Sequence, residues 1–162
     1  MVKHYNGPET VLPETELLLF AAARAQHVRQ VILPALAAGK VVLCDRFCDS
    51  TEAYQGAGRA LDLDFLRMLN RFATAGRMPD LTILLDLPPE IGLARAQSRG
   101  LAQGGGSGDR LEAERLDFHR RVREAYLAIA RREPERVRIF DATLELTGLH
   151  RAIAKAVANA LR

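Results

Sequence analysis

A short apolar segment that ends abruptly in an acid and a base constrains the fold of this chain most. Residues 41–44 are Val-Val-Leu-Cys, and Asp45 and Arg46 follow directly. A continuous apolar run of this length, with β-branched residues, is typical of a strand buried on both faces of a parallel sheet. Ligands bind beyond the carboxyl ends of strands in open parallel sheets, so we expect Asp45 and Arg46 to lie at the rim of a ligand site.

Two further apolar segments predict strands, and helical patterns separate them. The predicted strands cover residues 81–87 and 137–140. Pro34 should kink or restart the last turn of the first predicted helix, and Gly39 should cap its end. Strands that alternate with helices indicate an α/β fold with a parallel sheet. The predicted helices cover residues 14–38, 62–76, 89–99, 109–132 and 145–162.

The composition excludes several classes of protein. The length of 162 residues corresponds to one domain. The net charge of +3 is mildly basic and lacks the clustering of a nucleic-acid-binding protein. No apolar run approaches the roughly 18 residues of a membrane span, and no signal peptide is recognisable, so nothing indicates a membrane or export function. Cys44 and Cys48 have no histidines grouped with them as in a zinc site, and they predict reduced thiols in a cytoplasmic protein.

A group of polar and aromatic side chains follows Asp45 and Arg46 on a short predicted helix. Ser50 and Thr51 offer hydroxyls, Tyr54 a ring, and Gln55 an amide that both donates and accepts. Each of them alone is explained by an ordinary helix with Ser50 as its N-cap. Together with an arginine, they offer what a phosphate and a base require.

Two residues of the first predicted helix form a second candidate group. Phe20 and Arg24 are one turn apart and therefore share a face. The ordinary interpretation is a core Phe and an Arg that extends to solvent. The functional interpretation is a ring and a guanidinium that address the two ends of one nucleotide.

Two other features leave alternatives open. Asp86, at the end of the second predicted strand, is either a metal ligand or the cap of the next helix. The helix at residues 62–76, with Asp62 as its N-cap, carries an apolar stripe that we assign to the core, with a subunit interface as the alternative. The stripe consists of Phe65, Leu66, Leu69 and Phe72 or Ala73.

The segment VVLCDRFCDSTEAYQGAGR resembles the Asp-Arg-aromatic segment and following substrate helix of bacterial thymidylate kinases. Single motifs of this kind are weak, but several in family order are specific. The resemblance implies a P-loop kinase-like parallel sheet flanked by helices, the reaction ATP + dTMP → ADP + dTDP in dTTP biosynthesis, and a homodimer. It continues through ETELLLFAAARAQHV, PDLTILLDLPPEIGLARAQSRG, DRLEAERLDFHRRVREAYL and IFDAT.

The resemblance also implies roles for individual residues. Phe20 would stack on the pyrimidine, and Arg24 and Arg46 would hold the monophosphate. Asp45 would accept hydrogen bonds in that network or approach Mg²⁺ through water; no direct metal ligand is assigned. The residues placed around the acceptor nucleotide are Phe20, Arg24, Arg46, Ser50, Thr51, Tyr54 and Gln55.

On the donor side, the resemblance implies binding of ATP with Mg²⁺. The glycine-rich segment 100–108 corresponds to the flexible lid that closes over ATP. Arg110 would stabilise charge on the transferring phosphoryl group, with Arg99 behind it, while Arg115 could equally pair with a glutamate. Asp141 would lie near the adenine, or serve only as a turn residue.

Two family motifs are missing from these 162 residues. Thymidylate kinases open with a strand and the loop G-x-x-x-x-G-K-[ST], which is absent here, as is the family's Arg-Glu-Pro-Gly-Gly segment. We therefore expect a single domain, residues 1–162, that lacks the P-loop strand and its helix, roughly 30 residues in all. The favoured explanation is a true start upstream of Met1; closure of the sheet and a partner that fills the gap are alternatives. The functional alternatives are a non-catalytic nucleotide-binding or dimerising remnant, and a kinase for another pyrimidine monophosphate.

Overall fold

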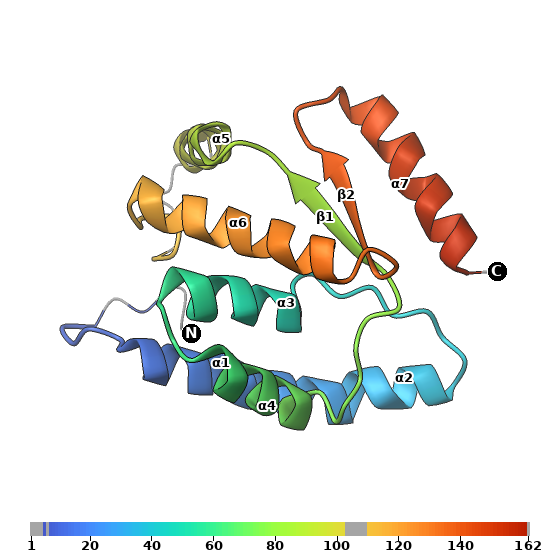
Figure 1. The fold of residues 1–162 in the computed structure, drawn as a ribbon, viewed down its shortest axis with the longest axis horizontal. Helices are drawn as coiled ribbons and strands as arrows, with labels where there is room; N and C mark the ends of the chain where they lie inside the picture. Colours follow the sequence, from blue (N-terminus) through green and yellow to red (C-terminus); the bar gives the residue numbers. More distant parts are fainter. Residues whose placement is uncertain (1–4, 6, 103–109, 162) are drawn as a thin grey trace. The chain divides into compact units, whose positions relative to one another are not determined.

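The computed structural model describes residue 5 and residues 7–102 and 110–161, with side chains left out at 100–102. The predicted lid, residues 100–108, therefore lies largely outside the described residues. The chain divides into two compact units, Met1–Met78 and Pro79–Arg162, and each is described by itself. Figure 1 shows the elements of both units. None of the described helices is long and apolar enough to cross a bilayer.

The first predicted helix is present in three consecutive pieces. Helix α1 (Pro13–His27) continues into a π-helical turn, η2 (Val28–Ile32), and then into α2 (Leu33–Ala37). Pro34 lies in the first turn of α2, as expected for a residue that lacks a backbone donor. Gly39, two residues past the end of α2, has φ +71°. The predicted restart at Pro34 and the left-handed cap at Gly39 are both confirmed.

The second half of unit 1 contains α3 (Cys48–Thr51), the π-helix η3 (Glu52–Gly58) and α4 (Leu63–Ala73). Asp62 is the N-cap of α4, and its carboxylate accepts a hydrogen bond from the backbone N–H of Phe65 at 2.7 Å, as predicted. Ser50 is not an N-cap, because α3 begins two residues earlier and Phe47 precedes it.

The prediction of a strand at residues 41–44 is wrong. These residues are irregular, and Val41 and Leu43 are 71% and 98% exposed. A strand is stable only when a neighbouring strand pairs with its backbone groups. Within the described part of the chain the sheet consists of two strands only, both in unit 2, so residues 41–44 have no partner there.

The core of unit 1 forms where α1 packs against α4. The two helices lie side by side in Figure 1. Leu66 and Ala73 are the fully buried apolar residues of the α4 stripe, whereas Phe65 and Phe72 are 46% and 71% exposed. The predicted stripe therefore divides into a buried face and an exposed apolar face. The other buried apolar side chains of unit 1 are Leu17, Ala21, Val28, Ile32, Cys48 and Ala53.

Unit 2 is built on two parallel strands, β1 (Thr82–Asp86) and β2 (Val137–Asp141). The register pairs Asp86 with Asp141, so both carboxylates lie at the carboxyl edge. The flanking helices are α5 (Pro89–Ala102), α6 (Leu116–Arg132) and α7 (Leu146–Ala160). Ile129 and Ala130 of α6 pack with Val137 and Leu84. Figure 1 shows the strands running in the same direction, with α6 and α7 on either side.

The predicted elements of unit 2 are confirmed, with one shift. Helix α6 starts at Leu116, seven residues after the predicted start, because residues 110–113 form turns. The Glu145 side chain caps α7 by accepting hydrogen bonds from the backbone N–H groups of Thr147 and Gly148. The α/β fold with a parallel sheet flanked by helices is therefore confirmed.

Candidate active site

One face of α1 carries three chemically distinct side chains. Glu16, Phe20 and Arg24 follow at intervals of four residues and therefore lie above one another. Glu16 contacts Gln55, and Arg24 contacts Thr51, which is also four residues from Gln55. These two contacts, Glu16–Gln55 and Arg24–Thr51, are the anchor points of the group, and Phe20 lies between them along α1.

The Arg24 guanidinium is held by three acceptors. Its Nη1 donates to Asn70 Oδ1 at 2.7 Å, and its Nη2 donates to Thr51 Oγ1 at 2.6 Å and to the Phe47 carbonyl at 3.4 Å. The guanidinium carbon also lies 5.8 Å from the centroid of the Phe47 ring. Asn70 is fixed in turn, because its Nδ2 donates to the Cys48 carbonyl at 3.3 Å. The orientation of Arg24 is thus set by α4, which carries Asn70, and by α3, which carries Thr51.

The hydrogen-bond partners of Arg24 are all neutral, and the Asp49 carboxylate favours its charged form without an ion pair to it. Burial lowers the pKa of the Arg24 guanidinium, since loss of water disfavours its charged form. Two other part-buried arginines, Arg59 and Arg123, each pair with a carboxylate, whereas the described residues provide no ion pair for Arg24. Burying a charge without a directly paired counter-ion costs free energy. An anion that binds Arg24 would recover part of this cost.

Gln55 and Glu16 form the other anchor point. Gln55 Nε2 donates to Glu16 Oε1 at 2.6 Å, and Arg59 Nη2 lies 3.4 Å from Glu16 Oε2. Glu16 is fully buried and Gln55 is 2% exposed. A carboxylate at such a position is stable only because both of its oxygens have donors.

Arg46 projects from the segment that precedes α3. It is exposed, and its guanidinium carbon lies 4.3 Å from the centroid of the Tyr54 ring. Its φ of +63° lies in the left-handed region, which non-glycine residues rarely adopt. Strain of this kind persists where the surrounding structure imposes it, and it is concentrated at functional sites. Asp45, just before it, is also exposed.

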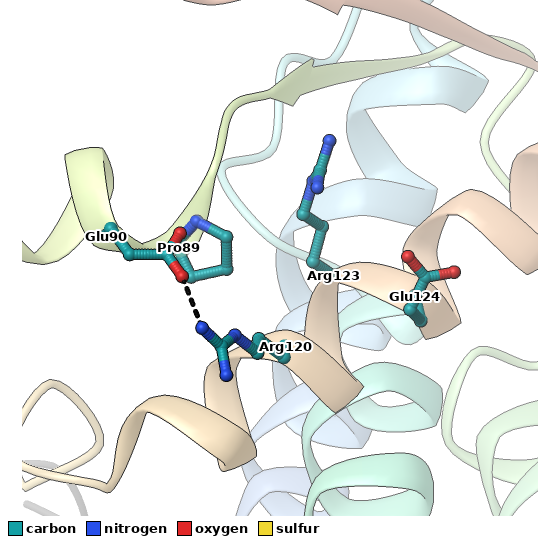
Figure 2. Close-up of a pocket in the computed structure, with 5 residues that line it drawn as sticks. All are labelled: Pro89, Glu90, Arg120, Arg123 and Glu124. Atoms are coloured by element: carbon teal, nitrogen blue, oxygen red, sulfur yellow. Dashed lines mark hydrogen bonds and ion pairs between the residues drawn. The ribbon is translucent and has the colours of Figure 1, made fainter.

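Unit 2 has a separate pocket, which Figure 2 shows. Its volume is about 320 Å³, and it lies between the start of α5 and α6. Arg120 Nη2 bonds to Glu90 Oε1 at 2.8 Å within it. The residues that line it are Pro89, Glu90, Arg120, Arg123 and Glu124.

Asp86, at the carboxyl end of β1, has a partner that the sequence did not predict. Arg123 Nε and Nη2 donate to its two carboxylate oxygens at 2.7 and 2.8 Å. This bidentate contact lowers the pKa of Asp86 and raises that of Arg123. Asp86 therefore connects β1 to α6.

The residues predicted to lie near ATP have simpler surroundings. Asp141 Oδ1 accepts from the backbone N–H and hydroxyl of Thr143 at 2.8 and 2.6 Å, the geometry of a turn residue. Arg99 is exposed on α5, and Arg110 is half-buried in the turn before α6. Their predicted roles with ATP remain predictions.

The structure brings several predicted acceptor-side residues together in unit 1. Arg24 contacts Thr51, Arg46 contacts Tyr54, and Phe20 shares a face with Arg24. Ser50 lies within α3, directly before Thr51. The roles assigned to these residues remain predictions.

The residues that hold this group in place were not predicted from the sequence. Glu16, Asn70 and Arg59 were not identified, and each bonds to Arg24, Gln55 or one another. A signal was present for two of them. Glu16 continues the four-residue spacing of Phe20 and Arg24, and Asn70 is a polar residue beside the apolar stripe of α4.

Comparison with known proteins identifies the family. The sequence model of the family described as "Thymidylate kinase" matches residues 1–153. The chain belongs to the thymidylate kinase family. It is 59% identical over 131 residues to the thymidylate kinase of Desulfosudis oleivorans, covering 80% of this chain and 61% of that protein. It is 50% identical over 152 residues to the thymidylate kinase of Syntrophus aciditrophicus, covering 93% of this chain and 69% of that protein.

A solved thymidylate kinase has a similar fold. The crystal structure of the enzyme from Ehrlichia chaffeensis matches with a TM-score of 0.69 and 28% identity, over 92% of this chain and 66% of that one. The chain thus spans about three-fifths of the length of its relatives from Desulfosudis oleivorans and from a Synechococcus strain (61% and 56%).

Proposed function

We propose that this chain takes part in phosphorylation of dTMP by ATP, and that unit 1 holds the acceptor nucleotide. The observation that carries the proposal is Arg24, a part-buried guanidinium with neutral hydrogen-bond partners. A monophosphate would supply the missing negative charge and accept charge-assisted hydrogen bonds.

The surrounding residues fit the rest of a nucleotide. Arg46, near Tyr54, is a second cation for the phosphate. Asp45, the residue before it, would accept hydrogen bonds in this network. The Phe20 ring, one turn from Arg24, is the platform for the pyrimidine. Ser50, Thr51, Tyr54 and Gln55 provide polar groups for base and sugar. The same arrangement would accept dUMP or dCMP in part, so the preference for dTMP is inferred from the family.

Thymidylate kinases use ATP and Mg²⁺, but the residues that the structure describes do not by themselves form a site for them. The 162 residues contain no G-x-x-x-x-G-K-[ST] loop. In the described part of the chain, no group of three or more His, Cys, Asp or Glu side chains could hold a metal ion. Phosphoryl transfer depends on cations positioned around the phosphates, and Arg110 and Arg99 are the proposed contributors. We therefore assign no step to the metal.

A second candidate function is nucleotide binding without catalysis, which the missing loop favours. Assaying ADP formation by the 162-residue chain with dTMP, ATP and Mg²⁺ separates the two functions. Turnover within the range of ordinary enzymes, about 1–10³ s⁻¹, is the result we expect of a kinase. ADP formation that is independent of dTMP would contradict the proposal.

The proposed assembly is a homodimer in the cytoplasm. Both cysteines are free thiols, as in a reducing compartment. Five apolar side chains of α1 and α4 are 43–71% exposed, and apolar patches on soluble proteins often mark interfaces. The family resemblance favours a second copy as the occupant. These side chains are Leu18, Leu19, Phe65, Met68 and Phe72.

Sedimentation of a charged variant tests this interface. Met68→Glu should shift the chain from dimer to monomer, since a buried charge at an interface is costly. Leu146→Glu, at a residue that is 77% exposed on α7, is the control and should leave the dimer intact. A wild-type monomer at the highest concentration tested would contradict the proposal.

A further inference from the structure

The amide of Gln55 is held in one orientation by a buried acid. Gln55 lies in η3, and its Nε2 donates to Glu16 Oε1 at 2.6 Å. Glu16 is fully buried, 39 residues away in the sequence, on α1. The contact therefore joins the two segments that carry the proposed acceptor site.

The chemistry of a carboxylate decides which end of the amide faces Glu16. An ionised carboxylate only accepts hydrogen bonds, so Gln55 must turn its NH₂ group toward it. Arg59, whose side chain is 15% exposed, stabilises this negative charge from the other oxygen at 3.4 Å. The side-chain carbonyl oxygen of Gln55, Oε1, consequently points away from Glu16, and no described residue donates a hydrogen bond to it, whereas the main-chain carbonyl of Gln55 accepts from the Leu61 N–H.

The neighbours of this pair belong to the proposed nucleotide site. Thr51, one turn before Gln55, bonds to Arg24, and Phe20 lies one turn after Glu16 on α1. A fixed carbonyl near a base platform is a hydrogen-bond acceptor with one orientation. Such an acceptor pairs with N3–H of thymine or uracil, whereas the same position of cytosine carries a lone pair.

We propose that Glu16 is a positioning residue that orients Gln55 so that its carbonyl selects a pyrimidine with a hydrogen-bond donor at N3. This inference rests on the proposed function, because it requires the nucleotide to occupy unit 1. It differs from a purely structural role for Glu16, which would affect folding and all ligands equally.

Calorimetric titration of the full 162-residue chain with dTMP and dCMP tests the proposal. The wild-type chain should bind dTMP more tightly than dCMP. In Glu16→Gln, either end of the Gln55 amide can face residue 16, so the preference should fall by about tenfold, the usual effect of one mispaired polar group. Glu14→Gln, an exposed glutamate in the same helical turn, is the matched control and should keep the preference.

A double variant distinguishes a lost orientation of the residue 55 side chain from misfolding. Far-ultraviolet circular dichroism and urea denaturation show whether each variant is folded. Glu16→Gln with Gln55→Glu exchanges the two groups, so that residue 55 still presents a fixed acceptor. It should retain the preference for dTMP even if total affinity falls. Loss of the preference in this variant would overturn the proposal.

The outcomes separate this inference from the proposed function. If the wild-type chain binds neither nucleotide, the proposed function fails and this inference fails with it. If the wild-type chain binds dTMP but does not discriminate, or if Glu16→Gln discriminates as well as Glu14→Gln, only the role of Glu16 is overturned.

Discussion

Arg46 combines a strained backbone with a side chain at the proposed phosphate site. Its φ of +63° costs roughly 1–2 kcal/mol relative to an ordinary conformation, and glycine would avoid this cost. Glycine would also lose the contact with the Tyr54 ring and gain entropy in the unfolded chain, effects of about 0.5–1 kcal/mol each. These contributions nearly cancel, so the position tests function separately from stability.

We predict that Arg46→Gly keeps the free energy of unfolding within about 1 kcal/mol of wild type while weakening dTMP binding by about tenfold or more. Urea denaturation and calorimetric titration measure the two effects. Ala60→Gly is the control, because Ala60 has φ +58° but no charge; it should gain stability and bind normally. Unchanged dTMP affinity in Arg46→Gly would argue against a phosphate contact.

Among the elements, α4 ends in a motif that normally contains glycine. Gly76 N–H bonds to the Arg71 carbonyl at 2.8 Å and Ala75 N–H to the Phe72 carbonyl at 3.2 Å, the two bonds of a Schellman motif. Ala75 occupies the left-handed position with φ +52°. Ala75→Gly should therefore raise the free energy of unfolding by roughly 0.5–1 kcal/mol, measurable by urea denaturation. A destabilised variant would show that this cap is not formed.

The ion pair between Asp86 of β1 and Arg123 of α6 predicts that the free energy of unfolding depends on pH. Arg123 lowers the folded-state pKa of Asp86, so the pair stabilises the fold above the unfolded pKa, near 4. This stability is lost as pH falls through the lower folded pKa. The Asp141 charge, across the strand pair, opposes the shift.

We expect Arg123→Gln to lower stability at pH 6 by about 1 kcal/mol or less, because both side chains are part-exposed. The difference from wild type should shrink between pH 4 and pH 2, as followed by urea denaturation. The control, Arg120→Gln, removes an ion pair with Glu90 in which both side chains are about half-exposed, and its effect should be smaller. Equal pH profiles for wild type and Arg123→Gln would refute the assignment.

Local signals predicted most elements, and non-local pairing explains the failures. The caps at Asp62 and Gly39 and the restart at Pro34 depend on residues within one or two turns. The strand at residues 41–44 failed because strand formation depends on a partner elsewhere in the sheet. In the site, Arg24 and Gln55 were predicted, but Asn70 and Glu16 were missed, since these pairs join residues 46 and 39 positions apart.

At the scale of the whole molecule, the proposed acceptor residues belong to one unit. Unit 1 contains Phe20, Arg24, Arg46 and the segment from Ser50 to Gln55, whereas the parallel strands and Arg110 belong to unit 2. The acceptor site can therefore be tested by nucleotide binding alone, without turnover. The charge of Arg24 is the property on which this test depends.

Calorimetric titration of wild type and Arg24→Gln with dTMP and with thymidine is the most direct measurement. Arg24→Gln should weaken dTMP binding by about tenfold or more and affect thymidine much less, because only dTMP carries the phosphate. Arg29→Gln, which removes an exposed arginine that also bonds to neutral carbonyls, should bind both ligands as wild type does. Equal losses for dTMP and thymidine in Arg24→Gln, or no dTMP binding by the wild-type chain, would contradict an acceptor site in unit 1.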